Sequence, residues 1–201
     1  MSRYIGPTWK ISRRLNYSLS QTGKELLNKE SKHVHKHKKR KNKLSDYGLQ
    51  LQEKQKVRFT YCVSEKQFKK IFYNAAKLKG THGEIFLMLL ESRLDRIVNL
   101  LDFARTISQA RQLISHGHIL VDGNKVDVAS YQVVPGQKIT LKNKSKELII
   151  VKESLNSRKN DKVQYVSLDK NSLVGTYVRH PYRHEFLTDI NENLIVEFYN
   201  R

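Results

Sequence analysis

The chain has 201 residues, with 38 Lys or Arg against 19 Asp or Glu, so its formal net charge is +19. Its length suits one large or two small domains, and its longest apolar run, residues 85–90, is far too short to span a membrane. A single cysteine, Cys62, excludes an internal disulfide and an all-cysteine zinc site, and the first residues contain no apolar signal-peptide core. We therefore expect neither a secreted, disulfide-linked protein nor a membrane protein.

The positive charge is concentrated at the start of the chain. Residues 1–45 carry 13 of the Lys and Arg and only two acidic residues. The run from Lys32 to Lys43 is almost wholly Lys, Arg and His and cannot bury enough apolar surface to order itself. We expect residues 1–44 to form an extended basic arm that becomes ordered on a polyanion such as folded RNA. A solvated tail that only raises solubility is the alternative.

Two features of this arm bear on ligands. Aromatic rings among cations favour base stacking and phosphate pairing, and the candidates here are Arg3, Tyr4, Trp9, Lys10, Arg13 and Arg14. Trp9 could equally be a packing anchor. The alternating His33, His35 and His37 would face one side of a strand as metal ligands do, but the Lys and Arg between Lys36 and Lys41 would repel a dication. No metal is therefore expected.

Helices are predicted from Ser45 onwards. Ser45 can cap a helix that includes Leu49, Leu51 and Val57. Capping-box pairs then open two more helices: Ser64 with Gln67, before an apolar face of Phe68, Ile71, Phe72 and Ala75, and Thr81 with Glu84, before the apolar segment 85–101. That segment is apolar over a wide arc and long for one helix, so we expect a buried spine with a break at Glu91-Ser92 and a domain boundary there.

A helix and a small antiparallel sheet are predicted next. Thr106 and Gln109 form a third capping-box pair, and Gly117 ends that helix. Apolar residues then alternate in short strands around turns at Asp122-Gly123 and Pro135-Gly136, in the order Ile119 and Val121, Val126 and Val128, Ile139 and Leu141, and Leu148 to Val151. Asp189 and Glu192 cap a last helix, whose apolar residues Leu194, Ile195 and Phe198 must dock elsewhere.

The helix after Thr106 has two faces. Ile107, Ala110 and Ile114 form its apolar face, and the polar face carries Arg105, Gln109, Gln112 and His116 with Ser108 and Arg111 beside it. Arg is suited to grip phosphate because its planar guanidinium binds two oxygens at once. A solvated helix face is the alternative. Arg93 and Asp95 could also pair within the protein, which is the preferred interpretation for Asp95.

Several motifs in order resemble one known family. Residues 93–139 resemble the S-four RNA-binding motif, with Arg93-Leu94-Asp95, Ala104-Arg105-Thr106, the run 109–114 and the run 116–123. The flanking motifs at 3–7, 44–51, 53–58 and 190–197 extend this likeness to the whole chain, which resembles the bacterial-type small-subunit ribosomal protein S-four family. The implied fold class is α+β: a basic arm (1–44), a helical domain (45–91, completed by 170–201), an inserted S-four domain (92–153) and a linker or return segment (154–169).

The resemblance also implies function. It implies a primary binder of small-subunit ribosomal RNA at a junction in the 5′ domain, which nucleates assembly in the cytoplasmic ribosome, with no cofactor. Further implied partners are the small-subunit protein S-five, other ribosomal proteins and messenger RNA, the last at Lys39, Arg40, Lys41 and Lys43. No membrane partner is expected. Beyond the residues already named, the RNA-binding candidates are Tyr47, Lys54, Lys56, Arg58, Lys69, Lys70, Arg93, Arg105, Thr106, Ser108, Gln109, Arg111, Gln112, His116 and His118.

The chain departs from the family pattern at a few positions. No cysteine lies in residues 1–61, so the zinc site of many relatives is not expected. Asp102 and Cys62 stand where glycine is common. Because Asp tolerates a left-handed backbone better than most residues, a helix end at Asp102 remains compatible with the fold. We interpret Cys62 as an apolar filler.

An RNA-modifying enzyme or a free RNA-binding factor is the alternative class, since S-four motifs also occur as appendages on pseudouridine synthases and tyrosyl-transfer-RNA synthetases. The rest of this chain shows no Gly-rich phosphate loop and no nucleophile paired with a base. His82, His180 and His184 have no acid or nucleophilic partner in the sequence pattern. We therefore expect a protein that is not an enzyme.

Overall fold

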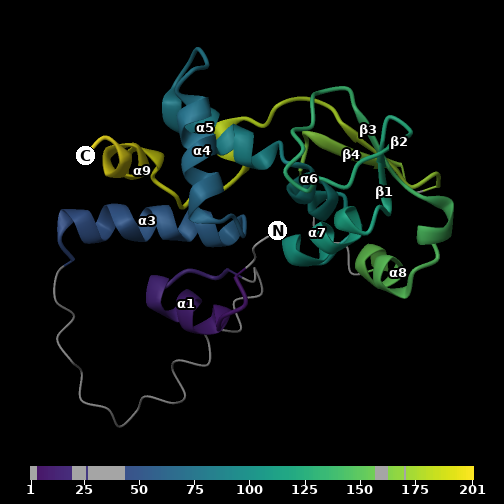
Figure 1. The fold of residues 1–201 in the computed structure, drawn as a ribbon, viewed down its shortest axis with the longest axis horizontal. Coiled ribbons are helices and arrows are strands. Elements are labelled where there is room, and N and C mark those ends of the chain that lie inside the picture. The colour runs from purple at the N-terminus through teal and green to yellow at the C-terminus, as the bar shows by residue number, and fades with distance from the viewer. Residues whose placement is uncertain (1–3, 20–25, 27–43, 157–162, 170) are drawn as a thin grey trace, which may run out of the picture. The chain divides into compact units, whose positions relative to one another are not determined.

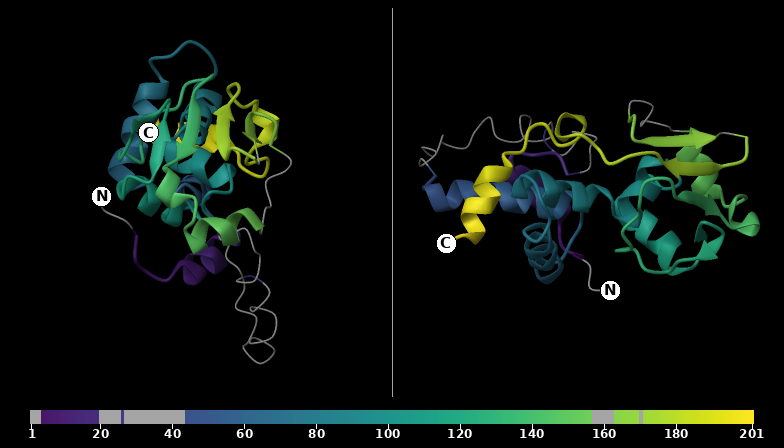
Figure 2. Two further views of the ribbon diagram at one scale, coloured as in Figure 1. Left: turned by 90° about the vertical axis from the view of Figure 1, so that its right-hand side faces the viewer. Right: turned by 90° about the horizontal axis from the view of Figure 1, so that it is seen from above.

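The computed structural model describes residues 4–19, 26, 44–156, 163–169 and 171–201. The chain forms two compact units, Met1–Gly83 with Asp189–Arg201, and Glu84–Thr188. The second unit is thus inserted into the first, as expected, and the path out of the first unit and back to it can be followed in Figures 1 and 2. The first unit ends at Gly83, however, rather than at the predicted boundary after residue 91.

The described part of the first unit is helical. It contains α1 (Thr8–Leu15), α3 (Asp46–Thr60), α4 (Glu65–Ala75), the start of α5 (His82–Glu91) and α9 (Glu192–Tyr199). The predicted apolar face of α4 is buried, and α9 packs along α3, which confirms that the last helix returns to this unit (Figure 1). Aromatic rings contribute to the packing of α9: the ring centroids of Tyr47 in α3 and Phe198 in α9 are 5.6 Å apart, and those of Phe72 in α4 and Tyr199 in α9 are 4.6 Å apart.

The prediction that the whole arm is extended is wrong for residues 8–15, which form α1. Pro7 precedes the first turn, where its fixed φ suits a helix start, and Asn16 ends the helix in the left-handed region. Ile11 and Leu15, one helical turn apart, are buried. The amide of Gln52 in α3 donates to the carbonyl of Leu15 at 2.9 Å, which ties the end of α1 to α3.

Only some of the helix caps predicted for this unit are present in the structure. Ser45 caps α3 as predicted, since its side chain accepts a hydrogen bond from the N–H of Gly48. Ser64 occupies the N-cap position of α4, but its side chain makes no capping bond, so the predicted capping box is wrong. The last helix is capped by Asn191, whose side chain accepts from the N–H of Asn193, and not by Asp189.

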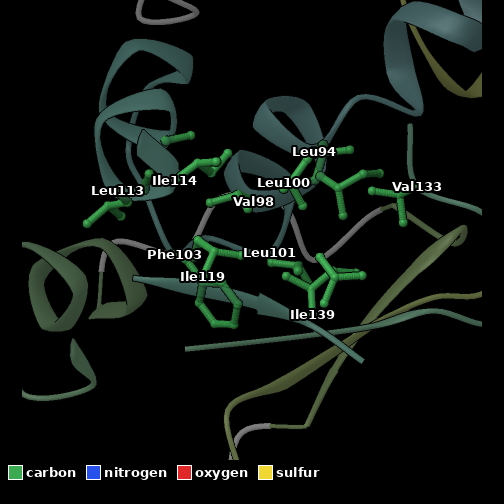
Figure 3. Packing of buried hydrophobic residues seen from close by; sticks show 14 of the residues in the cluster. Leu94, Val98, Leu100, Leu101, Phe103, Leu113, Ile114, Ile119, Val133 and Ile139 are labelled. Atoms are coloured by element: carbon green, nitrogen blue, oxygen red, sulfur yellow. The ribbon is translucent and has the colours of Figure 1, made fainter. Parts of the chain in front are cut away.

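The second unit places helices against an antiparallel sheet. After α5 come α6 (Leu94–Leu100), α7 (Ile107–Ser115), β1 (Ile119–Val121), β2 (Asn124–Lys125), β3 (Lys138–Leu141), α8 (Ile149–Asn156), β4 (Val166–Asp169) and β5 (Val174–Tyr177), with short 3₁₀ turns at Asn143–Ser145 and Arg183–Glu185. The strand order is β2-β1-β3-β5-β4, with Val121 opposite Ile139 and Ile139 opposite Gly175. Helix residues such as Leu94, Val98 and Ile114 pack with Ile119 and Ile139 in one apolar core (Figure 3).

Several predicted turns and breaks are confirmed. The apolar segment 85–101 is buried over most of its length and is divided between α5, which ends at Glu91, and α6. Gly117, with φ +72°, follows α7, and Asp102, with φ +57°, follows α6. Asp122 and Gly123 both have positive φ, as a two-residue hairpin turn requires. The fold class is therefore α+β, as expected.

Other predictions about the second unit are wrong. Leu148 to Val151 is not a strand, because α8 begins at Ile149 and buries Val151 and Ser154 at helical spacing. The strand predicted at Val126 and Val128 is only the short β2 before them. The segment expected to be a linker contains β4 and the buried Tyr165. Residues 170–188 do not complete the helical domain, since β5 pairs with β3 in the second unit.

In the part of the chain that the structure describes, no helix combines the length and the apolar character needed to cross a bilayer.

The side chain of Leu101 lies so close to Gly175 in β5 that replacing this glycine should lower the stability of the fold. A Cβ atom there would lie 2.4 Å from both terminal methyl carbons of Leu101, which is buried in the core. Because a packed core yields little, Gly175→Ala should lower the free energy of unfolding by about 1–3 kcal/mol in denaturant titrations. Ser167→Ala, on the neighbouring strand and exposed, is the matched control and should change it by less than about 0.5 kcal/mol. Equal stability of the two variants would contradict the packing described.

Candidate RNA interface

The structure separates the predicted cations into those that face carboxylates and those that face solvent. Lys54 is the clearest of the first kind. Its side chain is only 6% exposed, and its Nζ lies 2.7 Å from Oε1 of Glu65 and 4.3 Å from the centre of the Phe198 ring. Lys54 therefore holds α3, α4 and α9 together, and its role as an RNA-binding residue stays a prediction.

The carboxylate that receives Lys54 also receives a tyrosine. The hydroxyl of Tyr199 donates to Oε1 of Glu65 at 2.8 Å. Burial alone would raise the pKa of Glu65, but the hydrogen bonds from Lys54 and Tyr199 outweigh it and lower that pKa below its usual value. Burial, with the Glu65 carboxylate beside it, raises the pKa of Tyr199. Glu65 is therefore an anion that anchors the last helix.

Two more cations predicted to bind RNA on α3 are partly engaged within the protein. Lys56 pairs with Glu53, and Arg58 donates to the side chain of Gln55 at 2.9 Å and lies 3.6 Å from Glu65. By contrast, Lys69 and Lys70 on α4 are exposed, and Lys69 lies 5.8 Å from the ring centre of Tyr73, which is itself half-exposed. Tyr73 was not predicted, although it stands four residues after Lys69 on the same helix face.

The outer face of α1 is the first exposed basic surface. Lys10, Arg13 and Arg14 are exposed on the side of α1 away from its buried residues, and Trp9 is half-exposed beside them. Tyr4, also half-exposed, makes an edge contact with Phe59, with ring centroids 5.3 Å apart. We name Trp9, Lys10, Arg13 and Arg14 the α1 surface. Of the other candidates in the arm, Arg3, Lys39, Arg40, Lys41 and Lys43, and the histidines 33, 35 and 37, lie outside the described residues.

In the second unit, Arg93 and Arg111 converge on one buried carboxylate. Arg93 is 3% exposed, and its Nε and Nη2 donate to Oδ1 and Oδ2 of Asp95 at 3.0 and 2.8 Å. Nε of Arg111 donates to the same Oδ2 at 2.7 Å. The alternative in which Arg93 and Asp95 pair is confirmed. Arg111 turns toward α6 because it borders the apolar face of α7, and RNA binding by Arg93 and Arg111 stays a prediction.

The remaining polar face of α7 is exposed. Thr106 caps the helix by accepting the N–H of Gln109 at 3.2 Å, as predicted, while Oε1 of Gln109 accepts the N–H of Arg105 at 2.7 Å. In a complete capping box the Gln109 side chain would accept the N–H of the cap residue Thr106. Here it accepts the N–H of the preceding residue, Arg105. The amide N–H groups of Gln109 and the second lone pair of its oxygen remain for a ligand. The exposed candidates are Arg105, Thr106, Ser108, Gln112 and His116.

A second exposed basic surface surrounds Gly117. The rings of His116 and His118 are 6.0 Å apart, and Nδ1 of His118 lies 2.9 Å from Oγ of Ser145. The Lys125 side chain crosses Gly117 so closely that a Cβ there would lie 2.4 Å from its Cε. Burial, with His116 and Lys142 nearby, lowers the pKa of His118. We name His116, His118, Lys125 and Lys142 the Gly117 patch; its two lysines were not predicted, although Lys125 follows the predicted hairpin turn.

Comparison with known proteins shows which proteins this chain is similar to. A family model described as the ribosomal protein S4/S9 N-terminal domain matches residues 3–91, and one described as the S4 domain matches residues 92–139. Proteins named small ribosomal subunit protein uS4 are similar over the full length of both chains. They include those of Aster yellows witches'-broom phytoplasma (strain AYWB), 67% identical, Acholeplasma laidlawii (strain PG-8A), 62% identical, and Geobacillus sp. (strain WCH70), 56% identical.

Because Arg111 binds the buried carboxylate of Asp95 and Arg105 is exposed, replacing these two arginines should have very different effects on the free energy of unfolding. Asp95→Ala would leave the Arg93 charge buried without its anion, so it should lower the free energy of unfolding by about 3–5 kcal/mol. Arg111→Ala should also destabilise, whereas exposed Arg105→Ala should change stability by less than about 0.5 kcal/mol. Urea titration of the three variants measures this, and a destabilisation by Arg105→Ala equal to that by Arg111→Ala would contradict it.

The lowered pKa of His118 predicts a pH effect. Because the unfolded chain binds this proton more tightly, near the ordinary pKa of 6.5, His118 makes the folded state less stable as the pH falls below that value. Between about pH 7.5 and about pH 5.5, wild type should therefore lose more free energy of unfolding than His118→Asn. An equal loss in both proteins would mean that His118 titrates alike in the folded and unfolded chains.

Proposed function

The chain belongs to the family of small ribosomal subunit protein uS4, and on that premise we propose that it is a structural constituent of the small ribosomal subunit that binds its RNA through the α1 surface and the Gly117 patch. Membership of a ribosomal-protein family supports the expectation that the chain is not an enzyme and that it resides in the cytoplasmic ribosome. One observation carries the proposal: the cations on these two surfaces are exposed, whereas those beside buried carboxylates are not.

The chemistry of the two surfaces suits folded RNA. Phosphate contacts supply most of the affinity of such complexes, and Arg13 and Arg14 on α1 can each grip a phosphate with two N–H groups. Trp9 beside them offers a ring on which an unpaired base can stack. At the Gly117 patch the absence of a glycine side chain lets Lys125 lie close to the helix end, which concentrates positive charge there. Hydroxyl and amide groups of Ser108 and Gln112 suit sugar and phosphate oxygens nearby.

The finer parts of the function rest on family resemblance. We include in the proposal binding to a junction in the 5′ domain early in assembly, contact with the small-subunit protein S-five, contact with messenger RNA through Lys39, Arg40, Lys41 and Lys43, and a contribution to the accuracy of decoding. The residues for messenger contact lie outside the described part of the chain. Their sequence supports the role, since several cations in close succession suit a phosphate backbone.

Salt dependence tests the proposed binding. Since each neutralised phosphate releases counterions, the logarithm of the affinity for a small-subunit RNA transcript should fall steeply with the logarithm of salt concentration, with a slope several-fold more negative than about −1. Replacing Arg13 and Arg14 by Ala should make this slope less negative by about 2, and Lys152→Ala, on exposed α8, should leave it unchanged. Filter binding over a range of salt measures the slopes. A flat dependence in wild type would refute phosphate binding.

A further inference from the structure

One histidine of the Gly117 patch lies opposite a lysine at the end of a strand pair. His118 directly precedes β1, and its carbonyl accepts the N–H of Lys142 at 3.0 Å. Because Ile119 pairs with Leu141, His118 and Lys142 stand opposite each other just beyond the paired residues of β1 and β3. Side chains directly opposite in an antiparallel pair are neighbours, and like charges there repel. Lys142 therefore opposes a proton on the His118 ring.

Neighbouring elements add further cationic or protonatable side chains. The ring of His116, at the end of α7, lies 6.0 Å from that of His118. Lys125 of β2 crosses Gly117, the residue before His118, and Lys144 is exposed in the 3₁₀ turn before α8. In the ranges that the structure describes, none of these side chains forms an ion pair with a carboxylate. This part of the chain therefore supplies the patch with no anion of its own.

These surroundings disfavour the charged form of His118 in the free protein. Burial is the largest cause, and His116 and Lys142 add to it, so that the pKa of the ring lies below its ordinary value of 6.5. An RNA phosphate bound among these cations would bring a negative charge to the patch, and an opposite charge nearby favours the protonated ring. The pKa of His118 should therefore rise when RNA binds.

The hydrogen bond of His118 leaves one ring nitrogen for the phosphate. Nδ1 lies 2.9 Å from Oγ of the buried Ser145, and among the described residues Nε2 has no hydrogen-bond partner. In the protonated ring both nitrogens are donors, so Nδ1–H can donate to this hydroxyl while Nε2–H donates to a phosphate oxygen. Such a charge-assisted hydrogen bond is about twice as strong as a neutral one. A neutral ring with its hydrogen on Nδ1 would instead turn a lone pair toward the phosphate.

We propose that His118 takes up a proton from the solvent when RNA phosphate binds at the Gly117 patch, so that RNA binds more tightly as the pH falls from about 8 to about 6. The inference rests on the proposed function, since it requires RNA at this patch. Because the ring binds its proton more tightly in the complex, the affinity rises as the pH falls through the pKa of the complex, and the gain is complete below the pKa of the free protein. A difference of one between these two pKa values allows about a tenfold gain.

The pH dependence of RNA affinity tests the proposal. At constant ionic strength, full-length wild type should bind a small-subunit RNA transcript about three- to tenfold more tightly at about pH 6 than at about pH 8, as measured by filter binding. His118→Asn keeps a polar group beside Ser145 but cannot gain the charge, so it should lose most of this increase. His184→Asn, which replaces an exposed histidine outside the patch, is the matched control and should keep the increase. An increase of the same size in wild type and His118→Asn would overturn the proposal.

Counting the protons provides the second measurement. Titration calorimetry of the same binding, in two buffers of different ionisation enthalpy, gives the number of protons taken up with the RNA. Wild type and His184→Asn should take up more protons per chain than His118→Asn and His118→Gln. No net uptake by wild type would overturn the proposal even if both variants at position 118 failed to fold.

The two assays separate this inference from the proposed function. Tight RNA binding with equal proton uptake in wild type and in the folded variants at position 118 would overturn the inference and leave the proposed function standing. Failure of wild type to bind the transcript at every pH would refute the proposed function, and the inference with it.

Discussion

Carboxylates pair with neighbouring cations inside each unit, and these ion pairs fix the helices on which the rest of the structure depends. In a medium of low dielectric an unpaired charge is so costly that each buried carboxylate must hold its partner closely. Buried Asp95 holds Arg93 and Arg111, and buried Glu91 holds Arg96 at 2.8 Å and accepts the hydroxyl of Tyr165. In the first unit the buried charge is Lys54, which the partly exposed Glu65 holds. The chain has twice as many cations as anions, and among the described residues Lys10, Arg13 and Arg14 of the α1 surface are exposed.

The same ion pairs position the surfaces that carry the surplus. Asp95 lies at the start of α6 and, by binding Arg111, fixes α7 so that its other face, with Arg105 and Gln112, is exposed. In the first unit Glu65 receives both Lys54 of α3 and Tyr199 of α9. Charged residues of one type thus fall into two groups: some fix the helices, and their neighbours on the outer faces are exposed. Stability and binding can therefore be changed separately.

Local sequence rules predicted most of the elements that depend on local chemistry. The Ser45 and Thr106 caps, the helix end at Gly117 and the hairpin turn at Asp122-Gly123 each follow from the conformations those residues favour. What failed depends on packing between distant segments. A short apolar run such as 148–151 does not by itself distinguish a strand from a helix. The packing of Val151 and Ser154 into the second unit determines that it forms part of α8. Likewise Lys54 and Arg111 lie on helices where spacing indicates a polar side, but only the fold brings Glu65 and Asp95 to them.

The central claim is that RNA meets the exposed cations and not the paired ones. Photochemical crosslinking of the full-length chain to a small-subunit RNA transcript, followed by mass spectrometry of the linked peptides, tests it most directly. The account predicts crosslinks on the outer face of α1 and on the exposed face of α7 with its Gly117 patch. Crosslinks at Lys54 or Arg93, with none at α1 and α7, would contradict it.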